Sequence, residues 1–228
     1  MQPRLSYVLI TIAGIAVAAF VVGQAQAPQS GEDHRSTRQL IVHFMVSRVD
    51  DPIIVLGDSN VEASTLPREA CAHAIINAGL NGASTSSDLA GWLGQALAGK
   101  RAFAIILSVG TNDALRATPK DTFESRYGDL LKDLSKLTDK LFIVDILPVE
   151  QQQRLTPDMH ETLMKTIAEF RSVLPALAAR TGATLLPLPE MAQPFSIDGI
   201  HLNAAGYRAW DQAVMRGASL ACRSETQR

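Results

Sequence analysis

A run of aliphatic residues that stops on a small polar tetrapeptide restricts the fold of this chain most. Positions 53–56, Ile-Ile-Val-Leu, contain no polar residue, which is typical of a strand buried on both faces of a parallel sheet. The next four residues, Gly57-Asp58-Ser59-Asn60, are small or polar and end the strand. Taken alone, they are also compatible with an ordinary turn and a capping serine. A buried strand that ends here would hold the Ser59 hydroxyl at the edge of a sheet.

Apolar and amphipathic segments alternate along the rest of the chain. Apolar segments predict four further strands, at positions 75–78, 102–109, 141–146 and 183–186. Capping residues and helical spacing predict helices at positions 67–73, 89–97, 121–137, 159–180 and 203–217, with Pro175 kinking or dividing the fourth and Asn203 capping the fifth. Strands that alternate with helices form a parallel sheet covered on both faces. The predicted fold is α/β, a three-layer α/β/α sandwich of flavodoxin-like type with a parallel five-stranded sheet in the order 2-1-3-4-5.

The first 27 residues differ from the rest. Positions 5–22 are uncharged and largely apolar, follow Arg4, and are followed by small residues at alternate positions up to Ala27. These 18 residues would span about 27 Å as a helix, just enough to cross a bilayer. The segment is either a cleaved signal peptide or an uncleaved membrane anchor, and both predict an extracytoplasmic domain, periplasmic or secreted. A polar linker at 28–38 and a short helix at 39–48 are expected to lead into the first strand.

Polar residues collect where the predicted strands end. Ser59 follows the first strand, Gly82 the second, Asn112 the third, and Asp198 and His201 the fifth. Ligands of open parallel sheets bind at the carboxyl ends of the strands, where the strand order reverses. In the order 2-1-3-4-5 the first and third strands are neighbours, so Ser59 and Asn112 should face one crevice.

These residue types together match the requirements of acyl-ester hydrolysis. Ser59 can be the nucleophile, His201 the base that takes its proton, and Asp198 the carboxylate that orients the imidazole. The backbone N–H groups of Ser59 and Gly82, with the side-chain amide of Asn112, can form an oxyanion hole. Each residue alone is common in turns and loops, but their order and their positions at strand ends favour a catalytic site.

Four sequence blocks give the chain a specific resemblance to the SGNH hydrolase family, also called GDSL-type esterases and lipases. The blocks are Gly57-Asp58-Ser59-Asn60, Asn77-Ala78-Gly79-Leu80-Asn81-Gly82, Gly110-Thr111-Asn112-Asp113 and Asp198-Gly199-Ile200-His201. Many members have leucine where this chain has Asn60, a departure that leaves the catalytic set intact.

The resemblance covers about residues 52–217 and implies a Ser–His–Asp esterase that needs no metal or cofactor. In that family the oxyanion donors are the equivalents of Ser59, Gly82 and Asn112. The chain is therefore divided into a signal peptide or anchor (1–27), a linker and lead-in helix (28–50), a catalytic domain (51–220) and a tail (221–228). The alternative is a catalytically silent envelope module of the same fold that binds carbohydrate or lipid.

Charge and histidine spacing narrow the classes of partner. The net charge of −2 and a pI near 6.2 predict no binding to nucleic acid. The histidines outside the last block lack metal-ligand spacing, which argues against a zinc site. The expected substrates are small-molecule, lipid or O-acylated glycan esters.

The two cysteines suit an oxidising compartment. Cys71 and Cys222 can pair if the first and last helices share one face of the sandwich. Two buried thiols that act as small hydrophobic residues are the alternative.

Overall fold

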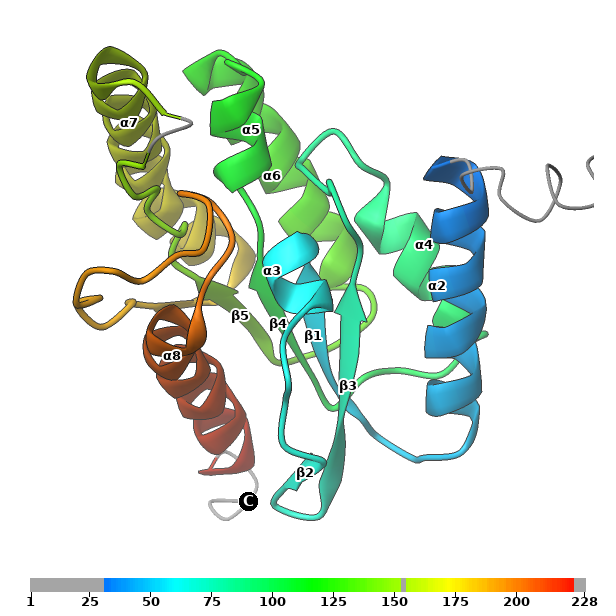
Figure 1. Ribbon diagram of the computed structural model, residues 1–228. Helices are drawn as coiled ribbons and strands as arrows, with labels where there is room; N and C mark the ends of the chain where they lie inside the picture. Colours follow the sequence, from blue (N-terminus) through cyan, green and yellow to red (C-terminus); the bar gives the residue numbers. More distant parts are fainter. Residues whose placement is uncertain (1–30, 153–154, 224–228) are drawn as a thin grey trace, which may run out of the picture. The chain divides into compact units, whose positions relative to one another are not determined.

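The computed structural model describes residues 31–152 and 155–223 and divides into two compact units, residues 1–37 and 38–228 (Figure 1). The first unit contributes only the start of helix α2 (Gly31–Ser47), and the predicted signal peptide or anchor at 1–27 lies outside the described residues. The sheet and the remaining helices belong to the second unit. Within the described ranges, no helix has both the length and the apolar character required to cross a membrane.

Six strands form one sheet in the order β2-β3-β1-β4-β5-β6. Five of them are parallel: β1 (Ile53–Gly57), β3 (His73–Gly79), β4 (Ala104–Ser108), β5 (Leu141–Val144) and β6 (Thr184–Leu186). Numbered as they occur in the chain, these five have the predicted order 2-1-3-4-5. Every residue of β1, β4 and β5 is buried, which explains why these strands read as uninterrupted apolar runs.

Helices cover both faces of the sheet, so the predicted three-layer fold is confirmed. Because side chains alternate along a strand, Ile54 and Leu56 of β1 face one layer while Ile53 and Val55 face the other. The first layer contains α2, α4 (Leu89–Leu97), α6 (Lys120–Leu134) and α7 (Pro157–Thr181). The second is α8 (Ala204–Arg223), whose Trp210 is fully buried against the sheet (Figure 1).

The short helix predicted at 67–73 is wrong. The chain forms strand β2 (Glu69–Ala70), antiparallel to β3, and reverses through Cys71 and Ala72. Both turn residues have positive φ, 50° and 65°, as a two-residue hairpin of the primed type requires. Side chains other than glycine, asparagine and aspartate rarely adopt this conformation, so the turn lacks its usual sequence signal.

A disulfide joins Cys71 in this turn to Cys222 near the end of α8, with the two Cα atoms 6.3 Å apart. The predicted pairing assumed that Cys71 lies on a helix, but Cys71 lies at the edge of the sheet. The bond connects residues 151 positions apart in the sequence.

The course of several helices differs from the prediction. Helix α2 begins at Gly31, within the segment expected to be a linker, because Glu32 and Asp33 in its first turn suit the positive end of a helix. Helix α7 continues through Pro175, which lies at an exposed position of the helix. Helix α8 reaches Arg223 because Ala218 and Ala221 are buried in the core, so the predicted tail at 221–228 begins as helix.

Candidate active site

Ser59 lies at the point where β1 ends and the short helix α3 (Ser59–Glu62) begins. Asp58 is the N-cap, and its buried side chain accepts a hydrogen bond from the Asn60 N–H at 3.0 Å. A Cβ atom at Gly57 would overlap the Ser108 carbonyl oxygen, so only glycine lets the strand end this close to β4. As the first residue of the helix, Ser59 has an N–H group with no partner in the helical ladder.

The segment after β6 brings His201 to Ser59. The Ser59 Oγ and His201 Nε2 atoms are 3.0 Å apart, and His201 Nδ1 lies 2.8 Å from Asp198 Oδ2. The other carboxylate oxygen of Asp198 accepts the backbone N–H groups of Ile200 at 3.0 Å and His201 at 2.8 Å. In the tautomer with a proton on Nδ1, the Nε2 lone pair faces the serine hydroxyl. The structure therefore places the three predicted residues in one hydrogen-bonded row.

The environment keeps Asp198 ionised. Burial alone would raise the pKa of its carboxyl group, but the hydrogen bonds from the His201 backbone, the His201 ring and the Ile200 backbone outweigh it. The net pKa lies below the ordinary value. The His201 side chain is 41% exposed, so a substrate in solvent can reach it.

Two of the predicted oxyanion donors, Gly82 and Asn112, lie in the segments that follow the two strands flanking β1. Gly57 is in register with Gly79 of β3 and Ser108 of β4, so these loops leave the sheet at the same level as Ser59. Asn112, on helix α5 (Thr111–Leu115), donates one amide hydrogen to the Ala83 carbonyl group at 2.9 Å. Its second amide hydrogen is available to a substrate oxygen.

Gly82 occupies a left-handed turn with φ of 71°. Its carbonyl oxygen accepts the Arg116 guanidinium at 2.8 Å, which ties it to the end of α5. Among the described residues, no turn or loop hydrogen bond uses the Gly82 N–H group. The turn at Gly82 and Ala83 is thus tied to α5 by two hydrogen bonds.

Two polar residues anchor the site through contacts that the sequence does not reveal. Asn77 donates to the Val61 carbonyl oxygen at 2.7 Å and accepts the Gly79 N–H at 2.9 Å, so it joins β3 to α3. Glu150 has a buried carboxylate that accepts the N–H groups of Phe195 and Ser196. Glu150 therefore fixes the start of the segment that carries Asp198. Neither residue lies in a periodic pattern, and only the folded chain gives it partners.

Asp58 is a buried acid with a strongly perturbed pKa. Burial raises the pKa of its carboxyl group to about 6 from 3.8, although the Asn60 N–H group and the nearby His201 partly offset the rise. The native state therefore binds more protons than the unfolded chain between about pH 4 and 6. The contribution of Asp58 to the free energy of unfolding falls as the pH rises through that window. Above it, the full cost of the buried Asp58 charge, about 3 kcal/mol, is present.

Asp58→Asn removes this penalty and is expected to shift the pH dependence of stability. The free energy of unfolding of the variant minus that of the wild type should be about 2–3 kcal/mol larger at pH 7 than at pH 4. Loss of the N-cap hydrogen bond adds an offset to this difference that does not change with pH. Urea unfolding followed by circular dichroism at several pH values measures this difference. Asp129→Asn, at an exposed position of α6, is the control. A difference that does not change with pH would contradict the buried ionised state.

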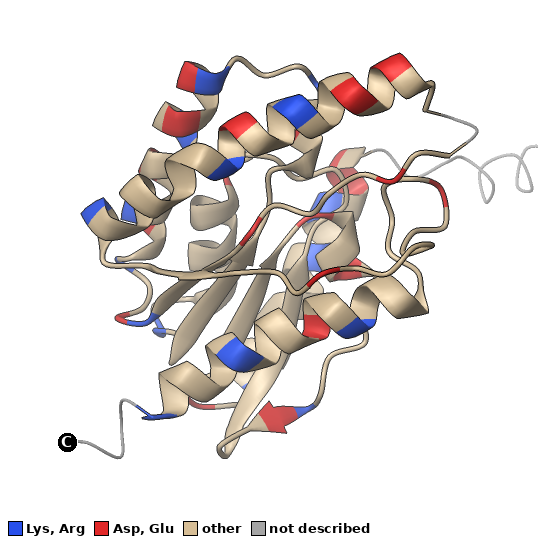
Figure 2. Ribbon diagram, turned by 90° about the vertical axis from the view of Figure 1, so that its left-hand side faces the viewer, with Lys and Arg blue, Asp and Glu red and all other residues tan. Residues whose placement is uncertain are grey.

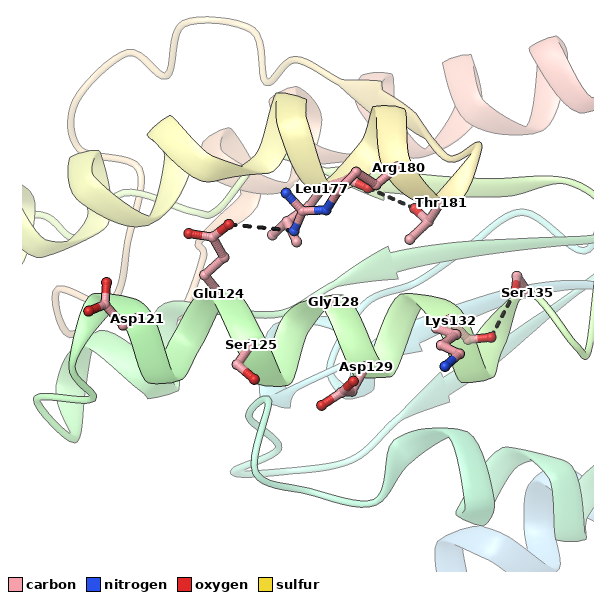
Figure 3. A pocket seen from close by; sticks show the side chains of 10 residues that line it. All are labelled: Asp121, Glu124, Ser125, Gly128, Asp129, Lys132, Ser135, Leu177, Arg180 and Thr181. Carbon is pink, nitrogen blue, oxygen red and sulfur yellow. Dashed lines mark hydrogen bonds and ion pairs between the residues drawn. The ribbon is translucent and has the colours of Figure 1, made fainter.

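A groove of about 810 Å³ lies on the outer surface between α6 and α7 (Figure 3). Glu124 and Arg180 point toward each other across it, with 3.4 Å between Oε1 and Nη2. Its lining includes none of the residues around Ser59.

On the side of the molecule in Figure 2, acidic and basic residues are mixed along α7 and α8. Within residues 31–152 and 155–223, no three His, Cys, Asp or Glu side chains are grouped to hold a metal ion.

A family model described as the GDSL-like lipase/acylhydrolase family matches residues 55–209. A search of curated proteins finds no match. Among solved structures, a Streptococcus pneumonia protein, provisionally described as a platelet activating factor, has a TM-score of 0.69 and 22% identity. The similarity covers 89% of this chain and 99% of that chain.

Two further structures share the fold at low identity. Axe2, an acetylxylan esterase from Geobacillus stearothermophilus, has a TM-score of 0.57 and 13% identity over 74% of this chain and 94% of its own. A member of the lipolytic G-D-S-L family from Veillonella parvula has a TM-score of 0.57 and 19% identity over 72% and 96%. Three Axe2 structures are described as catalytic mutants, with alanine in place of a serine, an aspartate and a histidine.

Proposed function

Because the chain belongs to the GDSL-like lipase/acylhydrolase family, we propose that it is an exported serine esterase that hydrolyses carboxylic esters. The observation that carries the proposal is the hydrogen-bonded row from Ser59 Oγ through the His201 ring to Asp198, at 3.0 and 2.8 Å. The catalytic aspartate and histidine of Axe2 are three positions apart, the same spacing as Asp198 and His201.

In the first half of the reaction, Ser59 Oγ attacks the ester carbonyl carbon while His201 Nε2 takes the hydroxyl proton. The imidazolium that forms is stabilised by the Asp198 carboxylate on its other nitrogen. The negative charge develops on the former carbonyl oxygen, which binds the N–H groups of Ser59 and Gly82 and the Asn112 amide. Breakdown of this intermediate breaks the C–O bond, and His201 protonates the departing alcohol.

In the second half, water hydrolyses the acyl-serine. His201 Nε2 takes a proton from the water as its oxygen attacks the acyl carbon, and the same donors hold the oxyanion. Collapse releases the carboxylic acid and returns the proton to Ser59 Oγ. Each half-reaction uses the same base and the same donors, so no further group is required.

The substrate class proposed is an acylated carbohydrate or small ester. The likeness to an acetylxylan esterase and the 41% exposure of the His201 side chain support an acyl group carried on a bulky alcohol. Deacetylation of glycans requires only that a small acyl group enter the site while the polymer remains outside.

Esterase activity on a substrate panel tests the proposed function. The purified wild-type protein is assayed on p-nitrophenyl acetate, butyrate and palmitate, and on acetylated xylan with released acetate as the readout. We expect turnover of the acetate esters, fastest among the p-nitrophenyl series for the shortest acyl chain. Rates no higher than those of Ser59→Ala on every ester would support the catalytically silent binding module instead.

The proposed location is extracytoplasmic, with the N-terminal segment serving as a signal peptide or membrane anchor. The disulfide between Cys71 and Cys222 supports this location because such bonds persist in oxidising compartments. Full-length protein expressed in bacteria should be recovered from the periplasmic or membrane fraction with no thiol that reacts with maleimide. Recovery from the cytoplasm with both thiols reactive would contradict the proposal.

A further inference from the structure

The residue after the candidate nucleophile makes an unusual pair of contacts. Asn60 is only 1% exposed, and its side-chain Oδ1 accepts the Leu202 N–H at 2.9 Å. Its Nδ2 donates to the Ile200 carbonyl oxygen at 3.3 Å. These two backbone groups belong to the peptide units on either side of His201. One side-chain amide therefore holds the backbone of the candidate base from both ends.

The contact joins two parts of the chain that are far apart in sequence. Asn60 lies on α3 with Ser59, whereas Ile200 and Leu202 lie 140 and 142 positions later. Asp198 cannot provide this link, because it belongs to the same segment as His201 and moves with it. The Tyr207 hydroxyl of α8 also donates to the Asn60 carbonyl oxygen at 2.9 Å, which holds α3 against the last helix.

In this chain the two backbone groups beside His201 are both paired by the side-chain amide at position 60. Leu202 presents a donor and Ile200 an acceptor, so the side chain between them must accept at one end and donate at the other. A leucine fills a similar volume but leaves both buried backbone groups unpaired. An aspartate accepts from Leu202 but turns an oxygen toward the Ile200 carbonyl oxygen, and it adds a charge beside buried Asp58.

We propose that Asn60 is a positioning residue that holds His201 Nε2 at hydrogen-bonding distance from Ser59 Oγ. The inference rests on the proposed function, because it assigns Asn60 a role in the same site. Asn60 touches neither the substrate nor the reacting atoms. It acts through His201, by fixing the backbone from which the imidazole extends.

Asn60→Leu is the main test variant. We expect its kcat for p-nitrophenyl acetate to fall about 10- to 100-fold, because small displacements of a catalytic group have effects of this size, while KM changes less than about threefold. Thr138→Val is the matched control, since it removes a buried hydroxyl with hydrogen bonds near the opposite end of the strands and should leave kcat unchanged.

A double-mutant cycle separates positioning from general loss of structure. In a His201→Ala background, Asn60→Leu should lower the residual rate less than about twofold, because the residue through which Asn60 acts is gone. A further loss as large as in the wild-type background would overturn the proposal and point to damage elsewhere in the fold. An unchanged kcat in the single variant would overturn it as well.

Crystal structures of the wild type and Asn60→Leu provide a readout that does not need activity. We expect the distance from Ser59 Oγ to His201 Nε2 to exceed 3.5 Å in the variant, and an unchanged distance of 3.0 Å would contradict the inference. An inactive wild type would defeat the proposed function, and the change in distance would still test the role of Asn60.

Discussion

Ser59→Ala should lower kcat/KM for ester hydrolysis by at least about 10³-fold, because the members of a triad act as a unit. Alanine removes only Oγ, the atom that lies 3.0 Å from His201 Nε2 and forms the acyl bond in the proposed reaction. The N-cap of α3 is Asp58, so the helix keeps its start in the variant. Residual hydrolysis should come only from water activated by His201 near the oxyanion donors.

Initial rates on p-nitrophenyl acetate, with melting temperatures for both proteins, measure this effect. Ser135→Ala, at the exposed C-cap of α6, is a control that should keep the wild-type rate. The acyl-serine should appear in the mass spectrum of the wild type after rapid acid quenching, and should be absent from Ser59→Ala. A variant within tenfold of wild-type activity would mean that another group is the nucleophile.

Asp198→Asn should lower kcat by about 10³- to 10⁴-fold, because the histidine loses its correct tautomer. The aspartate uses both oxygens as acceptors, one for His201 Nδ1 and the other for the N–H groups of Ile200 and His201. An asparagine has one acceptor atom and must turn its NH₂ group toward the ring or toward these backbone donors. With the NH₂ group toward the ring, Nδ1 becomes the acceptor and Nε2 carries the proton that faces Ser59.

Stopped-flow or steady-state rates across pH 5 to 9 separate this effect from a simple pKa change. Because the pKa of Asp198 lies below its ordinary value, the wild-type carboxylate stays ionised over this whole range. Its contribution to stability is therefore present above about pH 4 and lost as the pH falls through the native pKa. The Asp198→Asn deficit should be nearly constant from pH 5 to 9, and recovery of the wild-type rate at either end would contradict the tautomer argument.

The parts of this fold that were predictable are those with long uniform patterns. The apolar run of β1 and the polar blocks after β1, β3 and β4 predicted the positions of these three strands and of the segments that follow them. The cap at Asn203 was also predictable, and its Oδ1 accepts the N–H groups of Ala205 and Gly206. These features depend on neighbours in the sequence.

The features that escaped prediction depend on neighbours in space. Helices α3 and α5 have four and five residues, too few to show helical spacing. The positive φ angles of Cys71 and Ala72 occur without glycine or asparagine, in a turn attached to α8 by the disulfide. Glu150 and Asn60 look like ordinary loop residues until residues 195–202 fold onto them.

The sequence distance between Ser59 and His201 has a kinetic consequence. The two side chains are 142 residues apart, and the parallel strands β3, β4, β5 and β6 lie between them in the sequence. Closing such a distant contact is slow compared with forming a local helix. In a growing chain Ser59 is thus present long before His201, so the proposed hydrolysis must wait for the last segment. Ester hydrolysis during refolding would therefore report the arrival of the last segment, after helical content has already recovered.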